Sequence, residues 1–308
     1  MKFVFCANPL NRRSPDIDYQ AEVCAVEKLG FEYVLINYEA LVDENDASRA
    51  ASRVAKQSDS ELAIYRGWML KPEKYSQLFN ALAERGLYLI NTPTAYTHCH
   101  YLPESYSVIE YYTPKSVWMR TSANVKIEEI IDLLRLFDSQ PIVVKDFVKS
   151  RKHEWNEACY IPSASDCNAV ESVVNCFLQL QGNELNEGLV FREFIEFELL
   201  AQHSKSGMPL TKEFRLFFFD GEPIYSVEYW EEGDYQGISP LFAQFGQVAK
   251  AVQSRFFTMD VAKRIDGSWM IIELGDGQVA GLPEKVDIID FYRAIFKCLP
   301  VKIKTHHE

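Results

Sequence analysis

The chain has 308 residues, of which 47% are hydrophobic, so it can bury a large core in about two domains or one composite fold. Its formal net charge of −12 argues against nucleic acid or a membrane surface as the main partner. The seven cysteines are scattered without a Cys-x-x-Cys pair, and no segment has the pattern of a signal peptide or a membrane span. We therefore expect a cytoplasmic protein.

The first 95 residues predict strands that alternate with helices. Strands are expected at 2–7, 31–38, 61–65 and 88–91, and helices at 18–29, 47–56 and 72–85. This alternation implies a parallel sheet covered by helices, in which ligands collect at the carboxyl ends of the strands. Arg66 follows the third strand at such an end. Its two alternative roles are a contact with an acceptor substrate and a structural ion pair.

The pattern changes after a connection at 96–113 that is rich in Pro, Tyr and His. Strands are expected at 116–120 and 141–148 and helices at 127–137 and 169–180, followed by longer strands at 189–200, 213–219 and 223–229. A helix at 240–253, a hairpin at 257–276 and a closing helix at 288–297 follow. We expect an N-terminal α/β domain at 1–95, a central unit at 114–187, a C-terminal unit at 188–300 and a tail at 301–308.

The connection contains Thr97-His98-Cys99-His100, whose residue types raise the question of a zinc site. No second cluster of ligands stands nearby in the sequence, so a turn with partly buried side chains is the favoured interpretation. A second hypothesis is that residues 97–105 contact the acceptor substrate.

Two apolar runs flank Asp266-Gly267 and predict a β-hairpin near the C-terminus. Asp260 lies in its first strand, and Glu273 and Asp276 close its second. Facing residues of a hairpin lie about 5 Å apart, so the three carboxylates are expected to converge. Clustered carboxylate oxygens bind hard cations such as Mg²⁺. The alternative is an acidic hairpin end that faces solvent.

Two lysines are associated with strands upstream of the hairpin. Lys145 ends an apolar run and Lys115 opens the preceding strand, so on neighbouring strands they would grip one polyphosphate. The alternative is two unrelated surface lysines. The basic segment 149–153 is either a phosphate lid or a solvated loop. Neither a Gly-x-x-x-x-Gly-Lys nor a Gly-x-Gly-x-x-Gly motif is present, which disfavours P-loop and Rossmann sites.

The expected strand around residue 193 combines apolar residues with the carboxylates of Glu193, Glu196 and Glu198. Such a segment offers a purine an apolar slot, backbone hydrogen bonds and a carboxylate for the ribose hydroxyls. An edge strand with one charged face is the alternative. In the next strand, alternation places Glu213 and Arg215 on one face, where a simple in-strand ion pair is the alternative to a site.

Taken in chain order, these features resemble the ATP-grasp superfamily over nearly the whole chain. The resemblance is closest to its clade with one arginine and two lysines. It rests on Arg66-Gly67-Trp68, Thr113-Pro114-Lys115-Ser116 and Glu273-Leu274-Gly275-Asp276. It implies an ATP-grasp fold of α/β class, with α+β character in the C-terminal part, preceded by an N-terminal parallel α/β domain.

The resemblance also implies how ATP would be held. Lys115 and Lys145 would contact the α- and β-phosphates. Glu193 and the backbone of Phe194 and Ile195 would meet adenine. Either Glu196 or Glu198 would bind the ribose, and the sequence does not decide between them.

By the same resemblance, Asp260, Glu273 and Asp276 would bind Mg²⁺, and Arg215 would face the γ-phosphate or an acyl phosphate. Many ATP-grasp enzymes carry Glu-x-Asn as metal ligands, whereas the Asn position here is Gly275. Whether Asp276, one residue later, compensates for Gly275 stays open.

The implied function is an ATP-dependent carboxylate–amine ligase that works through an acyl phosphate, with ATP and Mg²⁺ as cofactors and Arg215, Lys145 and Arg66 as catalytic residues. The expected substrate is a small molecule, an amino acid, or a peptide or protein. Two alternatives remain: a kinase-like phosphotransferase, and a non-catalytic ATP-binding module, which Gly275 keeps open. The sequence does not decide the oligomeric state.

Overall fold

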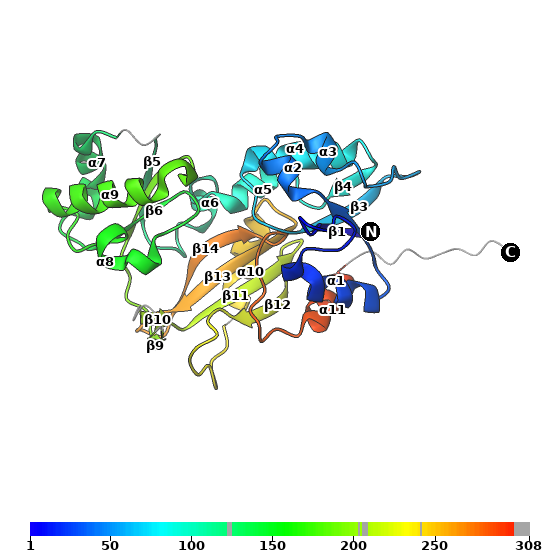
Figure 1. Ribbon diagram of the computed structural model, residues 1–308. Coiled ribbons are helices and arrows are strands. Elements are labelled where there is room, and N and C mark those ends of the chain that lie inside the picture. The colour runs from blue at the N-terminus through cyan, green and yellow to red at the C-terminus, as the bar shows by residue number, and fades with distance from the viewer. Residues whose placement is uncertain (122–124, 203, 205–208, 241, 299–308) are drawn as a thin grey trace.

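The computed structural model describes residues 1–121, 125–202, 204, 209–240 and 242–298. The expected tail at 301–308 lies outside the described residues. The structure is a mixed α/β fold with one parallel four-stranded sheet and two antiparallel ones (Figure 1). This architecture confirms the predicted fold class. None of the described helices is long and apolar enough to cross a membrane.

The N-terminal part is a parallel sheet of order β2-β1-β3-β4. Its strands are β1 (Lys2–Cys6), β2 (Glu32–Ile36), β3 (Glu61–Arg66) and β4 (Leu87–Leu89). Its helices are η1 (Ile17–Tyr19), α1 (Gln20–Lys28), α2 (Tyr38–Val42), α3 (Ala47–Ala50) and α4 (Pro72–Ala83). The predicted parallel sheet is confirmed. Helix α3 is much shorter than predicted, and α2 was not predicted because five residues show too little periodicity.

The connection between the first two sheets is helical. Helix α5 (Pro93–His100) begins at Thr92, whose side chain accepts a hydrogen bond from the Ala95 amide, and α6 (Leu102–Ile109) follows at once. The expected turn at 97–100 is therefore wrong, because these residues form the end of α5. A proline is favoured in the first turn of a helix, so Pro93 starts this segment instead of breaking it.

The central part is an antiparallel sheet of order β5-β8-β6-β7. Its strands are β5 (Ser116–Arg120), β6 (Ile142–Asp146), β7 (Tyr160–Ile161) and β8 (Gly188–Glu193). Its helices are α7 (Ile127–Leu134), η2 (Arg135–Phe137), η3 (Lys152–Glu154), α8 (Trp155–Ala158), α9 (Cys167–Gln181) and η4 (Gly182–Glu184). Because β8 lies between β5 and β6, the lysine-bearing strands are not neighbours as expected. The central sheet also extends past the expected boundary at 187.

The C-terminal part is an antiparallel sheet of order β12-β11-β13-β14, beside a small β9–β10 pair. The strands are β9 (Leu199–Gln202), β10 (Pro209–Thr211), β11 (Glu213–Phe219), β12 (Glu222–Glu228), β13 (Phe256–Lys263) and β14 (Trp269–Asp276). The helices are α10 (Phe242–Ala251) and α11 (Ile288–Lys297). The predicted hairpin is confirmed as β13–β14.

The long strand expected at 189–200 is interrupted between Glu193 and Leu199. At its start the Phe194 amide donates to the Pro141 carbonyl in the central sheet, and at its end the Glu198 amide donates to the Lys263 carbonyl in the C-terminal sheet. The chain crosses from one sheet to the other here, so its backbone partners change and the strand cannot continue.

The first and last parts of the chain share a hydrophobic core. Phe3 of β1 packs edge-on against Tyr292 of α11, with ring centroids 5.0 Å apart, and Phe217 of β11 packs against Phe291 at 4.9 Å. Figure 1 shows α1 and α11 side by side between the two sheets. The parallel sheet is therefore fixed against the sheet that carries the carboxylate hairpin.

Candidate active site

Strand register places three charged side chains in a row across the C-terminal sheet. Arg215 of β11 is paired with Asp260 of β13, which is paired with Glu273 of β14. The Arg215 guanidinium donates to both Asp260 oxygens, from Nε to Oδ1 at 2.9 Å and from Nη2 to Oδ2 at 2.8 Å. Asp260 is buried. Alternation along each strand aims all three side chains at one face of the sheet.

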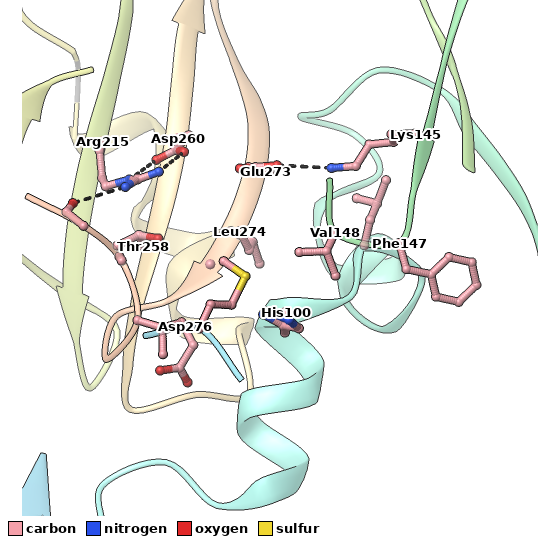
Figure 2. A pocket seen from close by; sticks show the side chains of 16 residues that line it. His100, Lys145, Phe147, Val148, Arg215, Thr258, Asp260, Glu273, Leu274 and Asp276 are labelled. Carbon is pink, nitrogen blue, oxygen red and sulfur yellow. Dashed lines mark hydrogen bonds and ion pairs between the residues drawn. The ribbon is translucent and has the colours of Figure 1, made fainter. Parts of the chain in front are cut away.

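The central sheet adds a fourth charge to this row. Lys145 of β6 donates from Nζ to Oε2 of Glu273 across 3.2 Å (Figure 2). Burial would raise the pKa of Glu273, but Lys145, Lys152 and Arg215 outweigh it and lower that pKa to about 2. Glu273 is thus held as a carboxylate where the two sheets meet. The row therefore holds two carboxylates between two cations, Arg215 at one end and Lys145 at the other.

Lys152 of η3 lies near the same charges and interacts with Glu273 and Asp260. Its ammonium is 5.5 Å from the ring centroids of both Tyr229 and Trp230. Burial would lower the pKa of Lys152, but Tyr229, Glu213 and Glu273 raise it above its ordinary value. The prediction singled out segment 149–153 as either a lid or a loop. What the sequence missed is that Lys152 lies against aromatic rings of the C-terminal part.

Glu213 begins β11 and is buried near this lysine. Burial raises the pKa of Glu213 to about 7, although nearby Lys152 lowers it and Asp260 raises it further. The site therefore holds a carboxyl group that titrates near neutral pH. Alternation predicts that Glu213 shares a face with Arg215, but nothing in the sequence indicates that Glu213 is buried.

The loop after β6 is fixed by one buried aspartate. Asp146 accepts hydrogen bonds from the amides of Val148 and Lys149 through Oδ1, and from Gln181 and Asn186 through Oδ2. Lys145 is the preceding residue, so this network sets the position of its backbone. The aspartate is the last residue of β6 and follows Lys145, and this place at the end of an apolar strand is the one sequence signal for its role.

Arg192 of β8 ties the central sheet to the hairpin strand. It donates from Nη1 to the Ile272 carbonyl at 2.8 Å and from Nη2 to the Thr113 hydroxyl at 2.7 Å. Thr113 in turn donates to the Ile271 carbonyl at 2.8 Å. Burial lowers the pKa of Arg192 to about 10, against the effect of nearby Glu273. These bonds hold β14 against β8, beside Glu273.

The three hairpin carboxylates do not converge as expected. Glu273 and Asp276 are three residues apart on β14, so their side chains point to opposite faces. Asp276 Oδ2 accepts from Asn91 Nδ2 at 2.6 Å, and Oδ1 accepts from the amide and side chain of Gln278. Burial raises the pKa of Asp276 to about 6. Figure 2 shows its carboxylate turned away from Glu273.

No group of three or more His, Cys, Asp or Glu side chains assembles into a metal site within the described ranges. Of the three hairpin carboxylates, Asp260 and Glu273 share a face, and Thr258 and Gly275 form the next pair on that face, two positions along the ladder. The zinc hypothesis for the 97–100 segment gains no support from this arrangement.

Arg66 lies apart from this row and is closed on all sides. Its guanidinium makes two hydrogen bonds to Glu22, at 2.8 and 3.0 Å, and donates to the carbonyls of Gly277 and Ala280 at 2.8 and 2.9 Å. Only 1% of Arg66 is exposed. Of the two roles expected for it, this geometry matches the structural ion pair.

The residues expected to contact adenine and ribose lie at 193–198, where the chain passes from the central sheet to the C-terminal sheet. Phe194 packs against Tyr160 of β7, with ring centroids 5.1 Å apart, and against Trp155 at 6.0 Å. Glu198 is paired with Lys212 and Lys263. The remaining three lie at the end of β8 and in the turn that follows, at Glu193, Ile195 and Glu196.

Lys115 is not brought together with Lys145. Its ammonium donates to the Leu136 carbonyl at 3.2 Å and lies 5.9 Å from the Phe137 ring, beside η2. The Lys115 carbonyl accepts from the Glu193 amide at 2.9 Å, which places the backbone next to the expected adenine segment. The side chain is exposed.

A pocket opens beside the charged row. It is lined by Lys145, Arg215, Thr258, Asp260 and Glu273 of the two sheets, and by His100 at the end of α5 (Figure 2). His100 stacks on Tyr96 with ring centroids 5.0 Å apart, and burial lowers its pKa to about 4. A neutral imidazole therefore borders the pocket, in the segment expected to contact the acceptor substrate.

Residues 135–295, just over half of the chain, match the sequence model of the ATP-grasp domain, R2K clade family 3. The chain belongs to this family. The match includes Lys145, Arg215, Asp260 and Glu273, so the charged row lies inside the ATP-grasp domain. The resemblance found in the sequence is confirmed. No curated protein matches the chain.

Solved structures of similar fold are ATP-grasp enzymes. The ATP-grasp ligase PsnB complexed with a minimal precursor is 14% identical, with a TM-score of 0.56 over 97% of this chain and 99% of that chain. D-cycloserine synthetase DcsG is 13% identical, with a TM-score of 0.57 over 96% and 99%. D-alanine–D-alanine ligase from Bacillus anthracis, complexed with ATP, is 14% identical, with a TM-score of 0.55 over 97% and 96%. At these identities the likeness shows an ATP-grasp ligase fold.

Proposed function

We propose that this protein is an ATP-dependent ligase that joins a carboxylate to an amine through an acyl phosphate. The observation that carries the proposal is the row Arg215, Asp260, Glu273 and Lys145, in which two cations flank two carboxylates where the two sheets meet. A triphosphate and its cation need this combination of positive side chains and clustered carboxylates. Membership of the ATP-grasp family supports the same assignment.

Asp260 and Glu273 suit Mg²⁺ as hard oxygen donors. Each carboxylate oxygen carries two lone pairs, so the hydrogen bonds to Arg215 and Lys145 leave room for a cation. Mg²⁺ in phosphoryl-transfer sites usually takes one or two protein carboxylates together with substrate phosphates, and it offsets the charge that develops there. Asp276 is bonded to Asn91 and Gln278 on the other face, so we propose that it orients the end of β14.

We propose that Lys145, which is buried beside Glu273, is the main contact for the phosphates of ATP. Lys152 is the second proposed phosphate contact. Lys115 would join them only by leaving the Leu136 carbonyl. Adenine would lie beside Phe194 and the backbone that follows Glu193. Of the two possible ribose ligands we choose Glu196, which is exposed, because Glu198 already pairs with two lysines.

The reaction would proceed in two steps. A carboxylate oxygen of the substrate attacks the γ-phosphorus, the bond to the β–γ bridging oxygen breaks, and ADP leaves with that oxygen. The amine nitrogen then attacks the acyl carbon, phosphate leaves, and the nitrogen loses a proton. Arg215 and Lys145 would neutralise the charge on the transferring group. No Ser, Cys or His dyad is placed at the pocket among the described residues, so the substrate is activated instead of the protein.

The acceptor would enter on the side of His100 and Met69, which line the same pocket. The similar structures carry precursor peptides in the case of PsnB and the macrocyclase MdnC from Microcystis aeruginosa MRC. Others act on small molecules by their names, such as D-cycloserine synthetase. We therefore propose a small amino acid, a peptide or a protein as the substrate that supplies the carboxylate or amine.

The test is ADP release over a panel of carboxylates and amines, with hydroxylamine present as a trap. A ligase gives a hydroxamate in proportion to ADP, because hydroxylamine attacks the acyl phosphate. Glu273→Gln should reduce the rate by about a hundredfold or more, since it removes a charge that holds the cation. Asp266→Asn, in the exposed turn of the same hairpin, is the matched control and should keep the wild-type rate.

Two other outcomes would replace the ligase assignment. ADP release with a phosphorylated alcohol and without hydroxamate identifies a kinase-like phosphotransferase. ATP binding without ADP release for any acid identifies a non-catalytic module, the alternative that Gly275 favours because it removes one expected metal ligand.

A further inference from the structure

Gly275 stands directly opposite Thr258 in the β13–β14 ladder, two pairs along from Asp260 and Glu273. A Cβ atom built on Gly275 would lie 2.6 Å from the Thr258 hydroxyl oxygen, which is closer than packed atoms approach. The hydroxyl oxygen therefore occupies the space where a side chain at position 275 would begin.

Backbone conformation does not explain the glycine. Gly275 is not among the glycines with positive φ, and it lies within the regular strand β14. Its Cβ would meet the Thr258 Cβ only at 4.0 Å, so the hydroxyl alone excludes a side chain here. The glycine and the threonine form a complementary pair, in which β13 supplies the polar atom that β14 lacks.

The Thr258 hydroxyl is also placed to meet a ligand. Thr258 is 2% exposed, and it lines the pocket (Figure 2). It precedes Asp260 by two residues, so alternation gives both side chains the same face. Within the described part of the chain its hydroxyl has no hydrogen-bond partner. The hydroxyl oxygen is not among the fully enclosed polar atoms that lack a partner, so it opens toward the pocket and is accessible to a ligand.

We propose that the Thr258 hydroxyl replaces the side chain missing at Gly275 and binds, together with Asp260 and Glu273, the divalent cation that accompanies ATP. This proposal rests on the proposed function, because it names a third ligand for that site. A hydroxyl and a carboxylate are an established pair of Mg²⁺ ligands, as in P-loop enzymes, where a Ser or Thr and an Asp hold the ion.

The spacing of the ladder supports three ligands for one ion. Side chains opposite each other in an antiparallel pair are about 5 Å apart, and those two residues apart on one strand are about 7 Å apart. Glu273 faces Asp260 directly across the ladder, and Thr258 lies diagonally across from Glu273 on the same face. An ion between these three side chains would meet neutral and anionic oxygens, and substrate phosphates would complete its shell.

The test measures Mn²⁺ binding by electron paramagnetic resonance in the presence of a non-hydrolysable ATP analogue. Thr258→Val keeps the shape and removes the oxygen, so it should weaken Mn²⁺ at least about tenfold, the lower limit for removing even an indirect metal contact. Thr258→Ser should retain the wild-type affinity. Metal-free binding of the analogue is measured on each variant and should stay within about twofold of wild type.

A reciprocal swap separates the ligand role from packing. Thr258→Ala opens the space opposite residue 275, so Thr258→Ala with Gly275→Asn returns an oxygen from the other strand and should recover Mn²⁺ affinity relative to Thr258→Ala alone. Recovery supports the ligand role, because the swap restores the oxygen without restoring the threonine.

Three results would overturn the proposal, and they have different consequences for the proposed function. Wild-type Mn²⁺ affinity in Thr258→Val rejects Thr258 as a ligand and leaves the ligase assignment standing. An equal loss of metal-free analogue binding also rejects it, and places the hydroxyl on phosphate. If wild-type protein takes up no Mn²⁺ with the analogue, the proposed function fails together with this inference.

Discussion

Two arginines of this chain, Arg66 fully buried and Arg215 partly buried, make the same bidentate contact with a carboxylate, and their surroundings give them opposite roles. Arg66 binds Glu22, and Arg215 binds Asp260. The remaining donors of Arg66 reach the carbonyls of Gly277 and Ala280. Glu22 also accepts from the Tyr292 hydroxyl at 2.5 Å. Every group around Arg66 is a fixed part of the fold.

The Arg215 pair instead borders a pocket. Its neighbours are ionisable side chains from other strands, and Glu273 lies next to Asp260 in the ladder. The carboxylate oxygens of Asp260 and Glu273 can still accept contacts from a ligand in the pocket. Burial and an ion pair alone therefore do not identify a functional arginine; what identifies it is a partner that faces a pocket.

The largest expected effect is the loss of stability when Arg66 is replaced. Arg66→Met should lower the free energy of unfolding by about 3–5 kcal/mol, because it leaves Glu22 buried without its partner. Denaturant unfolding measures the loss. ATP binding by the folded fraction should stay close to wild type, because none of the contacts of Arg66 belongs to the pocket row. A large loss of ATP affinity with unchanged stability would instead give Arg66 the substrate role.

The next effect is a pH dependence of protein stability that Glu213, near Arg215, is expected to cause. The pKa of Glu213 is raised to about 7 from 4.5, so between these pH values the folded protein binds more protons than the unfolded chain. Stability contributed by Glu213 therefore falls as pH rises through this window and is constant above it. Glu213→Gln removes the dependence. The variant should gain at most about 3 kcal/mol relative to wild type between pH 4.5 and 7.

The measurement is the free energy of unfolding of both proteins at a series of pH values. Taking the difference between them cancels the titration of other groups, including His100, whose low pKa works in the opposite direction. A difference that stays constant from pH 4.5 to 7 would show that Glu213 is ionised throughout.

The third effect concerns Lys145, the cation that joins the row from the other sheet. Lys145→Ala should weaken ATP binding by about 1.5–3 kcal/mol, roughly ten- to a hundredfold, because it removes a charge-assisted hydrogen bond to phosphate. Calorimetry measures the affinity. Lys250→Ala is the matched control, because Lys250 pairs with Glu222 on the surface. Equal ATP affinity in both variants would remove Lys145 from the phosphate site.

The hairpin could be predicted because its signal is local. The Asp266-Gly267 turn and the flanking alternation are enough to predict β13–β14 and to bring Asp260 near Glu273, which the structure pairs directly. The same alternation already contained the fact that Asp276 points away, since it lies three residues from Glu273. The number of carboxylates in a hairpin therefore does not predict a cluster unless strand alternation puts them on the same face.

The rest depended on contacts between distant segments. The guanidinium of Arg66 is enclosed by Glu22 and by the carbonyls of Gly277 and Ala280, which are more than 200 residues away in the sequence. The position of Lys152 over Tyr229 and Trp230 depends on how a short helical segment folds back onto another part of the chain. No residue type or spacing encodes these contacts. The place of β8 between β5 and β6 is of the same kind.

The smallest expected effect completes the comparison with a third pair of the same geometry. Arg255 donates to both oxygens of Asp220, at 2.7 and 2.9 Å, but the two side chains are 47% and 48% exposed. Water competes for both partners, so Arg255→Met should lower the free energy of unfolding by less than about 1 kcal/mol. ATP affinity should not change. The same denaturant experiment, run beside Arg66→Met, holds the substitution and the contact geometry constant and varies burial. If the two variants lose equal stability, burial does not set the strength of these pairs, and the contrast between Arg66 and Arg215 must come from their partners alone.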